Sequence, residues 1–189
     1  MKTMVLTFAL LSSLPVLAQA PAPKPVDAPA TYAKVLDDAV VYLEKQLVPA
    51  AEAMPDEKYA FVPAAGEFKD SRSFAQLVKH IAVNNYWMGS TILGEKMPVA
   101  DDAANNGPAS ITTKADIVKF LKDSLVYAHR AIATINEQNI LRPLKAPWGE
   151  PITRLRLATI IDSHGFDHYG QMALYLRLNG IVPPASRKP

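Results

Sequence analysis

Apolar residues recur at helical spacing in four segments of the chain, and segments rich in proline and glycine separate them. In the first segment, residues 31–54, the apolar positions fall on one helical face, which carries Tyr32, Val35, Leu36, Ala39, Val40, Leu43 and Leu47. This pattern predicts a long amphipathic helix. Pro49 lies inside it, and we expect a kink or an early end there, because proline lacks the backbone N–H that a helix uses.

Capping signatures precede the second and third of these segments. Ser73 followed by Gln76 has the spacing of a capping box and predicts the start of a second helix. Thr113 opens a third segment with a weaker, acidic form of the same signature. The fourth segment runs from about residue 153 to residue 179 and is followed by Gly180, a residue typical of helix C-termini.

Four helices without sustained strand alternation predict an all-α fold, and helices of this length favour a four-helix bundle. A short hairpin around Gly149, within residues 144–152, is the one departure that we expect. Two predicted connections, Pro55–Arg72 and Gly94–Thr112, are long for a bundle. Long ordered loops commonly carry function or cover a site.

The N-terminus has the features of a secretory signal peptide. A positive charge at Lys2 precedes a mostly apolar run at residues 4–17, and small residues allow cleavage after Ala18. The run is too short, and too interrupted by serine and proline, to span a bilayer. The sequence therefore predicts a periplasmic or secreted protein without a membrane span.

Residues 19–30 are mostly alanine and proline and have too little apolar mass to fold, which indicates an extended tether. We thus predict a signal peptide at 1–18, a tether at 19–30 and one helical domain at 31–186. The chain has no cysteine, so disulfides are excluded. An exported domain of this kind must be held together by packing, or partly by metal.

The charges are nearly balanced, with 20 lysine and arginine residues against 18 aspartate and glutamate residues and a net charge of +2. No basic cluster stands out, which argues against nucleic acid as a partner. We expect a small-molecule substrate instead. The sequence does not determine the oligomeric state, and a homodimer is compatible with it.

Two histidines lie one helical turn apart in the fourth segment, on its core-facing stripe. The stripe consists of Leu157, Ile161, His164, His168, Met172 and Tyr175. Burying an imidazole without hydrogen-bond partners costs roughly 1 to 3 kcal/mol per group, so two of them on this stripe need a reason. A bound metal ion is the simplest reason, and two packed histidines without metal are the alternative.

His80 is a third candidate ligand, because it lies beside the apolar stripe of the second segment and can point into a groove between helices. Ligands from facing helices converge in a bundle. Three imidazoles with open positions for water or substrate are the arrangement of a catalytic metal site. His129 lies at the margin of the third segment's stripe, and we interpret it as a surface or edge residue.

Other known metal and haem motifs do not match. A metalloprotease H-E-x-x-H motif would need glutamate where Gly165 stands. A di-iron bundle would need Glu-x-x-His on two helices, and neither histidine-bearing segment has it. Covalent haem would need cysteine.

Three stretches together resemble the DinB/YfiT-like family: Phe74–Ala82 with its single histidine, His164-x-x-x-His168-Tyr169-Gly170-Gln171, and the ending Tyr175–Pro184. The resemblance covers about residues 31–186. It implies a four-helix bundle that binds a divalent metal through three histidines, which map here to His80, His164 and His168. It also implies metal-dependent hydrolase or thiol-transferase chemistry, and an exported protein would meet little of the cytosolic thiol.

The leading hypothesis is therefore an exported enzyme in which a divalent metal acts as a Lewis acid in hydrolysis or group transfer on a small molecule. Three imidazoles suit zinc, nickel, iron or copper, so the ligand set does not name the metal. The sequence shows no convincing general base or nucleophile. The competing hypothesis is a non-catalytic periplasmic metal-binding or interaction module, and a metal-free bundle is the weakest alternative.

Overall fold

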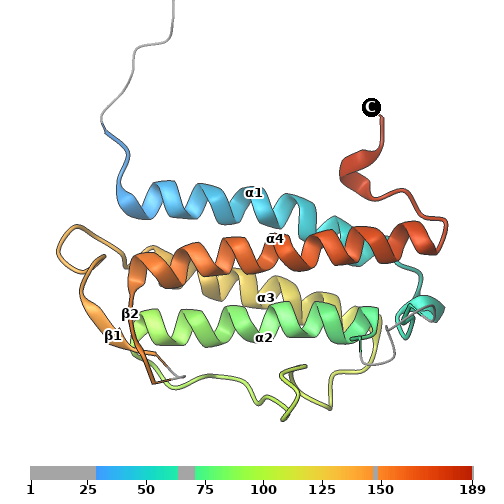
Figure 1. Ribbon diagram of the computed structural model, residues 1–189, viewed down its shortest axis with the longest axis horizontal. Helices are drawn as coiled ribbons and strands as arrows, with labels where there is room; N and C mark the ends of the chain where they lie inside the picture. Colours follow the sequence, from blue (N-terminus) through green and yellow to red (C-terminus); the bar gives the residue numbers. More distant parts are fainter. Residues whose placement is uncertain (1–28, 64–70, 147–148, 189) are drawn as a thin grey trace, which may run out of the picture.

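The computed structural model describes residues 29–63, 71–146 and 149–188. Within these residues the chain forms four long helices, namely α1 (Tyr32–Ala53), α2 (Phe74–Leu93), α3 (Lys114–Ile132) and α4 (Arg154–Leu178) (Figure 1). Two 3-10 turns, at Asp56–Lys58 and Pro184–Ser186, and two short strands complete the described elements. The expected all-α four-helix bundle is confirmed.

Each of the four helices begins at a hydroxyl residue whose side chain accepts a hydrogen bond from the backbone N–H three residues later. These N-caps are Thr31, Ser73, Thr113 and Thr153. At α2 the capping box is complete, because Gln76 Oε1 also accepts the backbone N–H of Ser73 at 2.8 Å. The capping signals in the sequence thus set the helix starts.

The expected early end at Pro49 is wrong, because α1 continues through this residue to Ala53. Leu47, Ala50 and Ala51 around the proline are completely buried. Their burial offsets the roughly 3 kcal/mol that an interior proline costs a helix.

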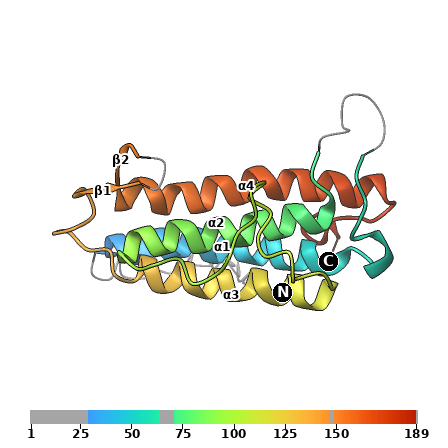
Figure 2. The ribbon, with the colours of Figure 1, turned by 90° about the horizontal axis from the view of Figure 1, so that it is seen from below.

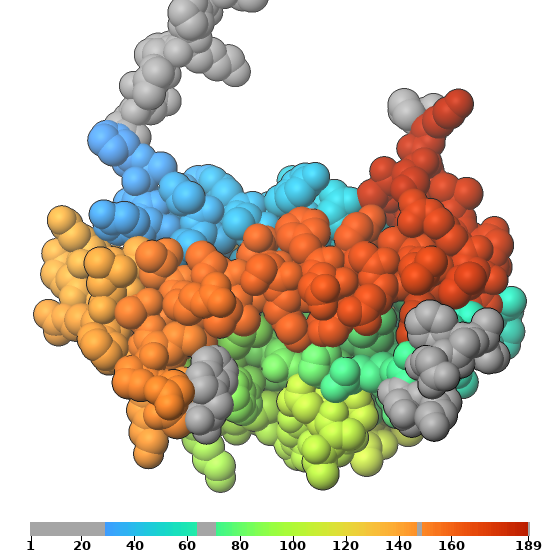
Figure 3. Space-filling model, in the orientation of Figure 1, coloured from blue at the N-terminus to red at the C-terminus, as the bar shows by residue number. Residues whose placement is uncertain are grey.

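The four helices do not alternate in direction along the chain, as they do in bundles in which short connections join consecutive helices. α1 and α4 run in one direction, and α2 and α3 run in the other (Figures 1 and 2). Since α2 and α3 pack side by side and point the same way, residues 94–113 must return along the whole bundle to join them. We call this connection the crossover. It forms the lower surface of the molecule beneath α4 and α2 in Figure 3.

The crossover is fastened to α2 by a buried lysine. Lys79 Nζ donates to the backbone carbonyls of Pro108 at 2.6 Å and Ile111 at 3.1 Å. Gly107 has a φ of +71° and lies against Phe120 of α3 and the backbone of Lys79, where a Cβ would be tightly placed. The crossover therefore follows a defined path over α2 rather than a loose one.

The predicted hairpin around Gly149 is confirmed by β1 (Pro143–Lys145) and β2 (Pro151–Thr153), which pair antiparallel with Leu144 opposite Ile152. No helix of the described residues is long and apolar enough to cross a membrane. The predicted signal peptide and nearly all of the tether lie outside the described residues.

Candidate metal centre

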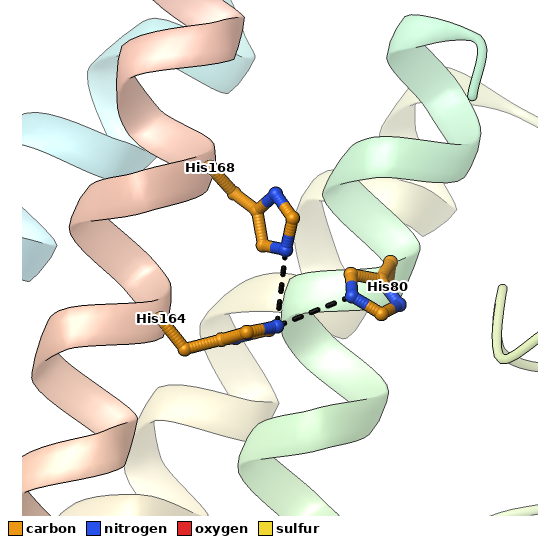
Figure 4. A group of neighbouring side chains, drawn as sticks. All are labelled: His80, His164 and His168. Carbon is orange, nitrogen blue, oxygen red and sulfur yellow. Dashed lines mark hydrogen bonds between the residues drawn. The ribbon is translucent and has the colours of Figure 1, made fainter. Parts of the chain in front are cut away.

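Three histidine side chains from α2 and α4 converge between these two helices (Figure 4). The Nε2 atom of His164 lies 3.1 Å from Nε2 of His80 and 3.0 Å from Nε2 of His168. All three candidate ligand atoms lie within 4.8 Å of one another. The structure thus brings together the three histidines that the sequence singled out.

Local helix geometry places the two histidines of α4. His164 and His168 lie one turn apart, so both face α2, where His80 meets them. Gly165 lies on a different side of the helix, against α1, and a Cβ there would be 2.3 Å from Leu43 Cδ2. The glycine that rules out a metalloprotease motif therefore allows α4 to lie close to α1.

Two of the three nitrogen–nitrogen distances suit a small divalent cation. With metal–nitrogen bonds of about 2.0 to 2.1 Å, two ligand nitrogens lie about 3.3 Å apart on a tetrahedral ion and about 3.0 Å apart on an octahedral one. The two short distances in the cluster, 3.0 and 3.1 Å, agree with this range.

Hydrogen bonding among the three rings does not account for the cluster. His80 Nδ1 lies 2.6 Å from the backbone carbonyl of Asn105. A carbonyl only accepts, so Nδ1 carries the hydrogen and Nε2 of the neutral ring presents a lone pair. His164 Nε2 faces two other Nε2 atoms and has at most one hydrogen to give. A cation shared by the three lone pairs resolves this arrangement.

Burial keeps the three rings neutral. It lowers the pKa of His164 to about 3, with further lowering by the charges of His168, His80 and Arg72. Burial is also the main cause that lowers the pKa of His80 and the pKa of His168. His80 is 9% and His168 8% exposed. Neutral imidazole is the form that binds metal, so the site favours the ligand-competent state near pH 7.

The outer nitrogens of the rings differ from one another. Nδ1 of His164 and Nδ1 of His168 are buried and have no hydrogen-bond partner among the described residues. Asp167 lies 3.8 Å from His168 Nδ1, beyond hydrogen-bond distance, and its side chain is 71% exposed. By contrast, the outer nitrogen of His80, Nδ1, forms a hydrogen bond with a backbone carbonyl.

His129 lies apart from this cluster, on α3. Its Nδ1 atom lies 2.5 Å from Asp37 Oδ1 of α1, and its Nε2 atom lies 3.4 Å from Glu44 Oε2. The side chain is partly buried, as expected of an edge residue, but no pattern in the sequence indicated its acidic neighbours on α1.

The sequence pattern did not reveal the part of the crossover that contacts His80. Asn105 supplies the carbonyl, and Asp101 binds the Asn105 side chain. A signal for this turn is present in Asp101-Asp102-Ala103-Ala104-Asn105-Asn106-Gly107, because Asp, Asn and Gly at this density are typical of tight turns. The path that brings the turn to α2 was not foreseeable from the pattern.

The fold and the cluster define a helical-bundle protein with a candidate three-histidine metal centre. A family model described as the DinB superfamily matches residues 40–172, and the chain belongs to this superfamily. No curated protein matches the chain.

Several solved structures share the fold. A DinB-like protein from Bacillus cereus ATCC 10987 has a TM-score of 0.63 and 15% identity, and the match covers 79% of this chain and 93% of that one. YfiT from Bacillus subtilis, described as a probable metal-dependent hydrolase with an unusual four-helix bundle topology, has a TM-score of 0.55 and 18% identity over 84% of this chain and 94% of that one.

The colibactin self-resistance protein ClbS, solved in complex with a dsDNA, has a TM-score of 0.57 and 15% identity over 80% of this chain and 98% of that one. At these identities the similarity shows the fold alone.

Proposed function

We propose that this protein binds a divalent metal ion through His80, His164 and His168 and acts as a metal-dependent hydrolase or group transferase on a small molecule. The convergence of three Nε2 atoms at 3.0 and 3.1 Å carries the proposal. The description of YfiT as a probable metal-dependent hydrolase supports the reaction class. Zinc, nickel and iron are the candidate ions, since imidazole suits all three.

The bound ion would supply Lewis-acid chemistry, polarising a substrate oxygen or activating water. The chain's own residues would make that chemistry available by offering three neutral nitrogens. Three protein ligands would leave further coordination positions for water or substrate, as catalytic sites require. His164 is only partly buried, so the cluster is not sealed from the surface.

A structural metal is the second candidate function. The three histidines join α2 to α4, so an ion held there would cross-link the bundle as well. None of the carboxylates in the described residues forms a hydrogen bond with the three rings at the centre, which is the observation that favours this alternative.

The proposal is tested by metal content and turnover together. We expect one equivalent of zinc, nickel or iron in the wild-type protein and hydrolysis of at least one member of a panel of small chromogenic esters, amides and phosphoesters. His80→Ala, His164→Ala and His168→Ala should each lower metal affinity substantially, since two ligands leave an incomplete shell. His129→Ala is the matched control and should keep the stoichiometry.

Metal binding without turnover of any substrate would favour the structural alternative. A His80→Ala variant that binds metal like the wild type would contradict the three-histidine site.

We further propose that the protein is exported, as the charged start, the apolar run and the small residues at the cleavage site suggest. N-terminal sequencing of the exported form tests this and should find a chain that begins near Gln19. A cytosolic protein that retains Met1 would contradict export and would restore the thiol-transferase option.

A small molecule rather than nucleic acid is the proposed ligand, because the net charge is only +2 and no basic cluster stands out. The structure of ClbS in complex with a dsDNA does not favour the exclusion of nucleic acid as a ligand. Titration with dsDNA at low salt tests it, and micromolar binding that weakens steeply with added salt would contradict it.

The homodimer also stays a prediction. Measurement of the molecular mass in solution tests it.

A further inference from the structure

We propose that the turn at residues 101–107 of the crossover, which we call the Asn105 turn, positions His80 for metal binding. In this arrangement the Asn105 carbonyl orients the ring, and Asp101 holds Asn105 in place. Both are positioning residues that act through His80. The inference rests on the proposed function, because it concerns how well the chain prepares one ligand of the metal centre.

The contact between the turn and His80 is short and directional. His80 Nδ1 donates to the Asn105 carbonyl at 2.6 Å, which turns the opposite nitrogen, Nε2, toward His164. The Asn84 amide nitrogen also lies near Nδ1, at 3.3 Å, but it is itself a donor. It donates to the His80 carbonyl at 2.8 Å and to Asn105 Oδ1 at 2.6 Å, so Asn84 joins the turn to α2.

The backbone of Asn105 adopts an uncommon conformation to present this carbonyl. Its φ is +56°, and no other residue except glycine has a positive φ in the described part of the chain. A left-handed conformation is unfavourable for an ordinary residue, and asparagine tolerates it better than most. The surrounding contacts must therefore hold the conformation.

Those contacts bind both ends of the Asn105 side chain. Oδ1 accepts from Asn84, and Nδ2 donates to Asp101 Oδ2 at 2.6 Å. The other carboxylate oxygen of Asp101 accepts the backbone N–H groups of Asp102 and Gly107, both at 2.9 Å. Asp101 thus ties the two ends of the turn together and fixes the asparagine between them.

The contact between the Asn105 turn and His80 is not needed to hold the crossover on α2. Lys79 already fastens the crossover to α2 at Pro108 and Ile111, so the path does not depend on the His80 contact. The outer nitrogens of His164 and His168 have no partner among the described residues, whereas His80 has a carbonyl. Such outer contacts fix the tautomer of a ligand and raise its basicity, and their loss typically lowers metal affinity 10- to 100-fold.

The first test is Asn105→Gly, which keeps the positive φ accessible but removes both side-chain hydrogen bonds. Zn²⁺ affinity is measured by competition with a chromogenic chelator. We expect affinity to fall about 10- to 100-fold with one site per chain retained. Asn139→Gly is the matched control, because Asn139 holds another turn through Thr134 and Asn136, and its affinity should stay within about twofold of the wild type.

Rescue distinguishes positioning from general loosening. In Asp101→Asn alone, an amide N–H of residue 101 faces the amide N–H of Asn105, so two donors meet. If the Asn105 amide flips, its N–H faces the Asn84 amide nitrogen instead. Asn84 cannot flip in turn, because its amide nitrogen donates to the His80 carbonyl. Combining Asp101→Asn with Asn105→Asp exchanges donor and acceptor and restores every hydrogen bond of the turn. We expect the single variant to lose affinity and the double variant to recover most of it.

A second readout uses the metal-free protein. Nitrogen-15 NMR of the His80 imidazole should show the Nδ1–H tautomer in the wild type and in the double variant, and a mixture of tautomers in Asn105→Gly. Unchanged Zn²⁺ affinity and an unchanged tautomer in Asn105→Gly would overturn the inference while leaving the metal site intact. A wild type that binds neither Zn²⁺ nor Co²⁺ would overturn the proposed function, and this inference with it.

Discussion

At the residue scale, the cluster consists of three imidazoles. Burying each of them costs free energy, and burial also favours their neutral form. His164 lies between the other two, and its pKa is the one lowered to about 3. A chain that only needed a filled core would place apolar residues at these positions, as it does at Leu157, Ile161 and Met172 on the same stripe. Packing alone therefore does not explain three histidines here, which agrees with the proposed metal centre.

The lowered pKa of His164 makes stability depend on pH. In the unfolded chain the pKa is about 6.5, so between pH 6.5 and about 3 the unfolded state binds a proton that the folded state does not. The free energy of unfolding should therefore be highest above pH 6.5 and fall on acidification, by up to about 1.4 kcal/mol per pH unit for one such group. Urea titrations of metal-free protein measure this dependence.

His164→Asn provides the comparison, because the carboxylates that also titrate in this range contribute equally to both proteins. The variant should lose less stability than the wild type between pH 6.5 and pH 4. Parallel pH profiles for the two proteins would show that the folded state does not hold His164 in its neutral form.

At the element scale, the sequence determined the helices well and the connections poorly. Ser73 with Gln76 predicted the start of α2 because a capping box satisfies backbone donors that any helix leaves open. The course of the crossover depends on long-range contacts, such as Lys79 with the Pro108 carbonyl, and no local pattern encodes these. His80 could thus be predicted as a candidate ligand, but its hydrogen-bond partner Asn105 could not.

Two glycines of α4 give a matched test of how closely this helix approaches α1. A Cβ on Gly165 would collide with the fully buried Leu43, whereas a Cβ on Gly170 meets nothing within 4 Å. Gly165→Ala should lower the free energy of unfolding by about 1 to 3 kcal/mol, as overpacking does. Gly170→Ala should raise it by about 0.5 to 1 kcal/mol, because alanine favours the helix. Chemical denaturation measures both.

Leu43→Ala checks the cause of the Gly165 effect. Since the smaller side chain makes room for the added methyl group, the double variant should lose less stability than the sum of the two single variants. Additive losses would mean that the collision with Leu43 is not what limits residue 165.

At the scale of the whole molecule, the topology brings the site together. α4 returns beside α1 and faces α2, so two histidines that are 84 residues apart in sequence meet across one helix interface. Amphipathic patterns predict that helices pack but not which neighbours run parallel, so the sequence supported a bundle without its helix directions. The same parallel packing of α2 and α3 requires the crossover that reaches His80.

Because the candidate metal ligands lie on two helices, metal binding should stabilise the whole fold. An ion at 100 times its dissociation constant adds about 2.7 kcal/mol to the free energy of unfolding, if the unfolded chain does not bind it. For a chain of this size that corresponds to an increase in Tm of about 5 to 10 °C. Calorimetry with added Zn²⁺ and with excess chelator measures the difference, which should vanish in His80→Ala and persist in His129→Ala. It should also shrink at acidic pH, below the lowered pKa values of the three buried histidines, because protons then compete for the same nitrogens and the stabilisation belongs to the deprotonated site. If Tm changes neither with chelator nor with the His80 substitution, three packed histidines without metal would be the better interpretation of the cluster.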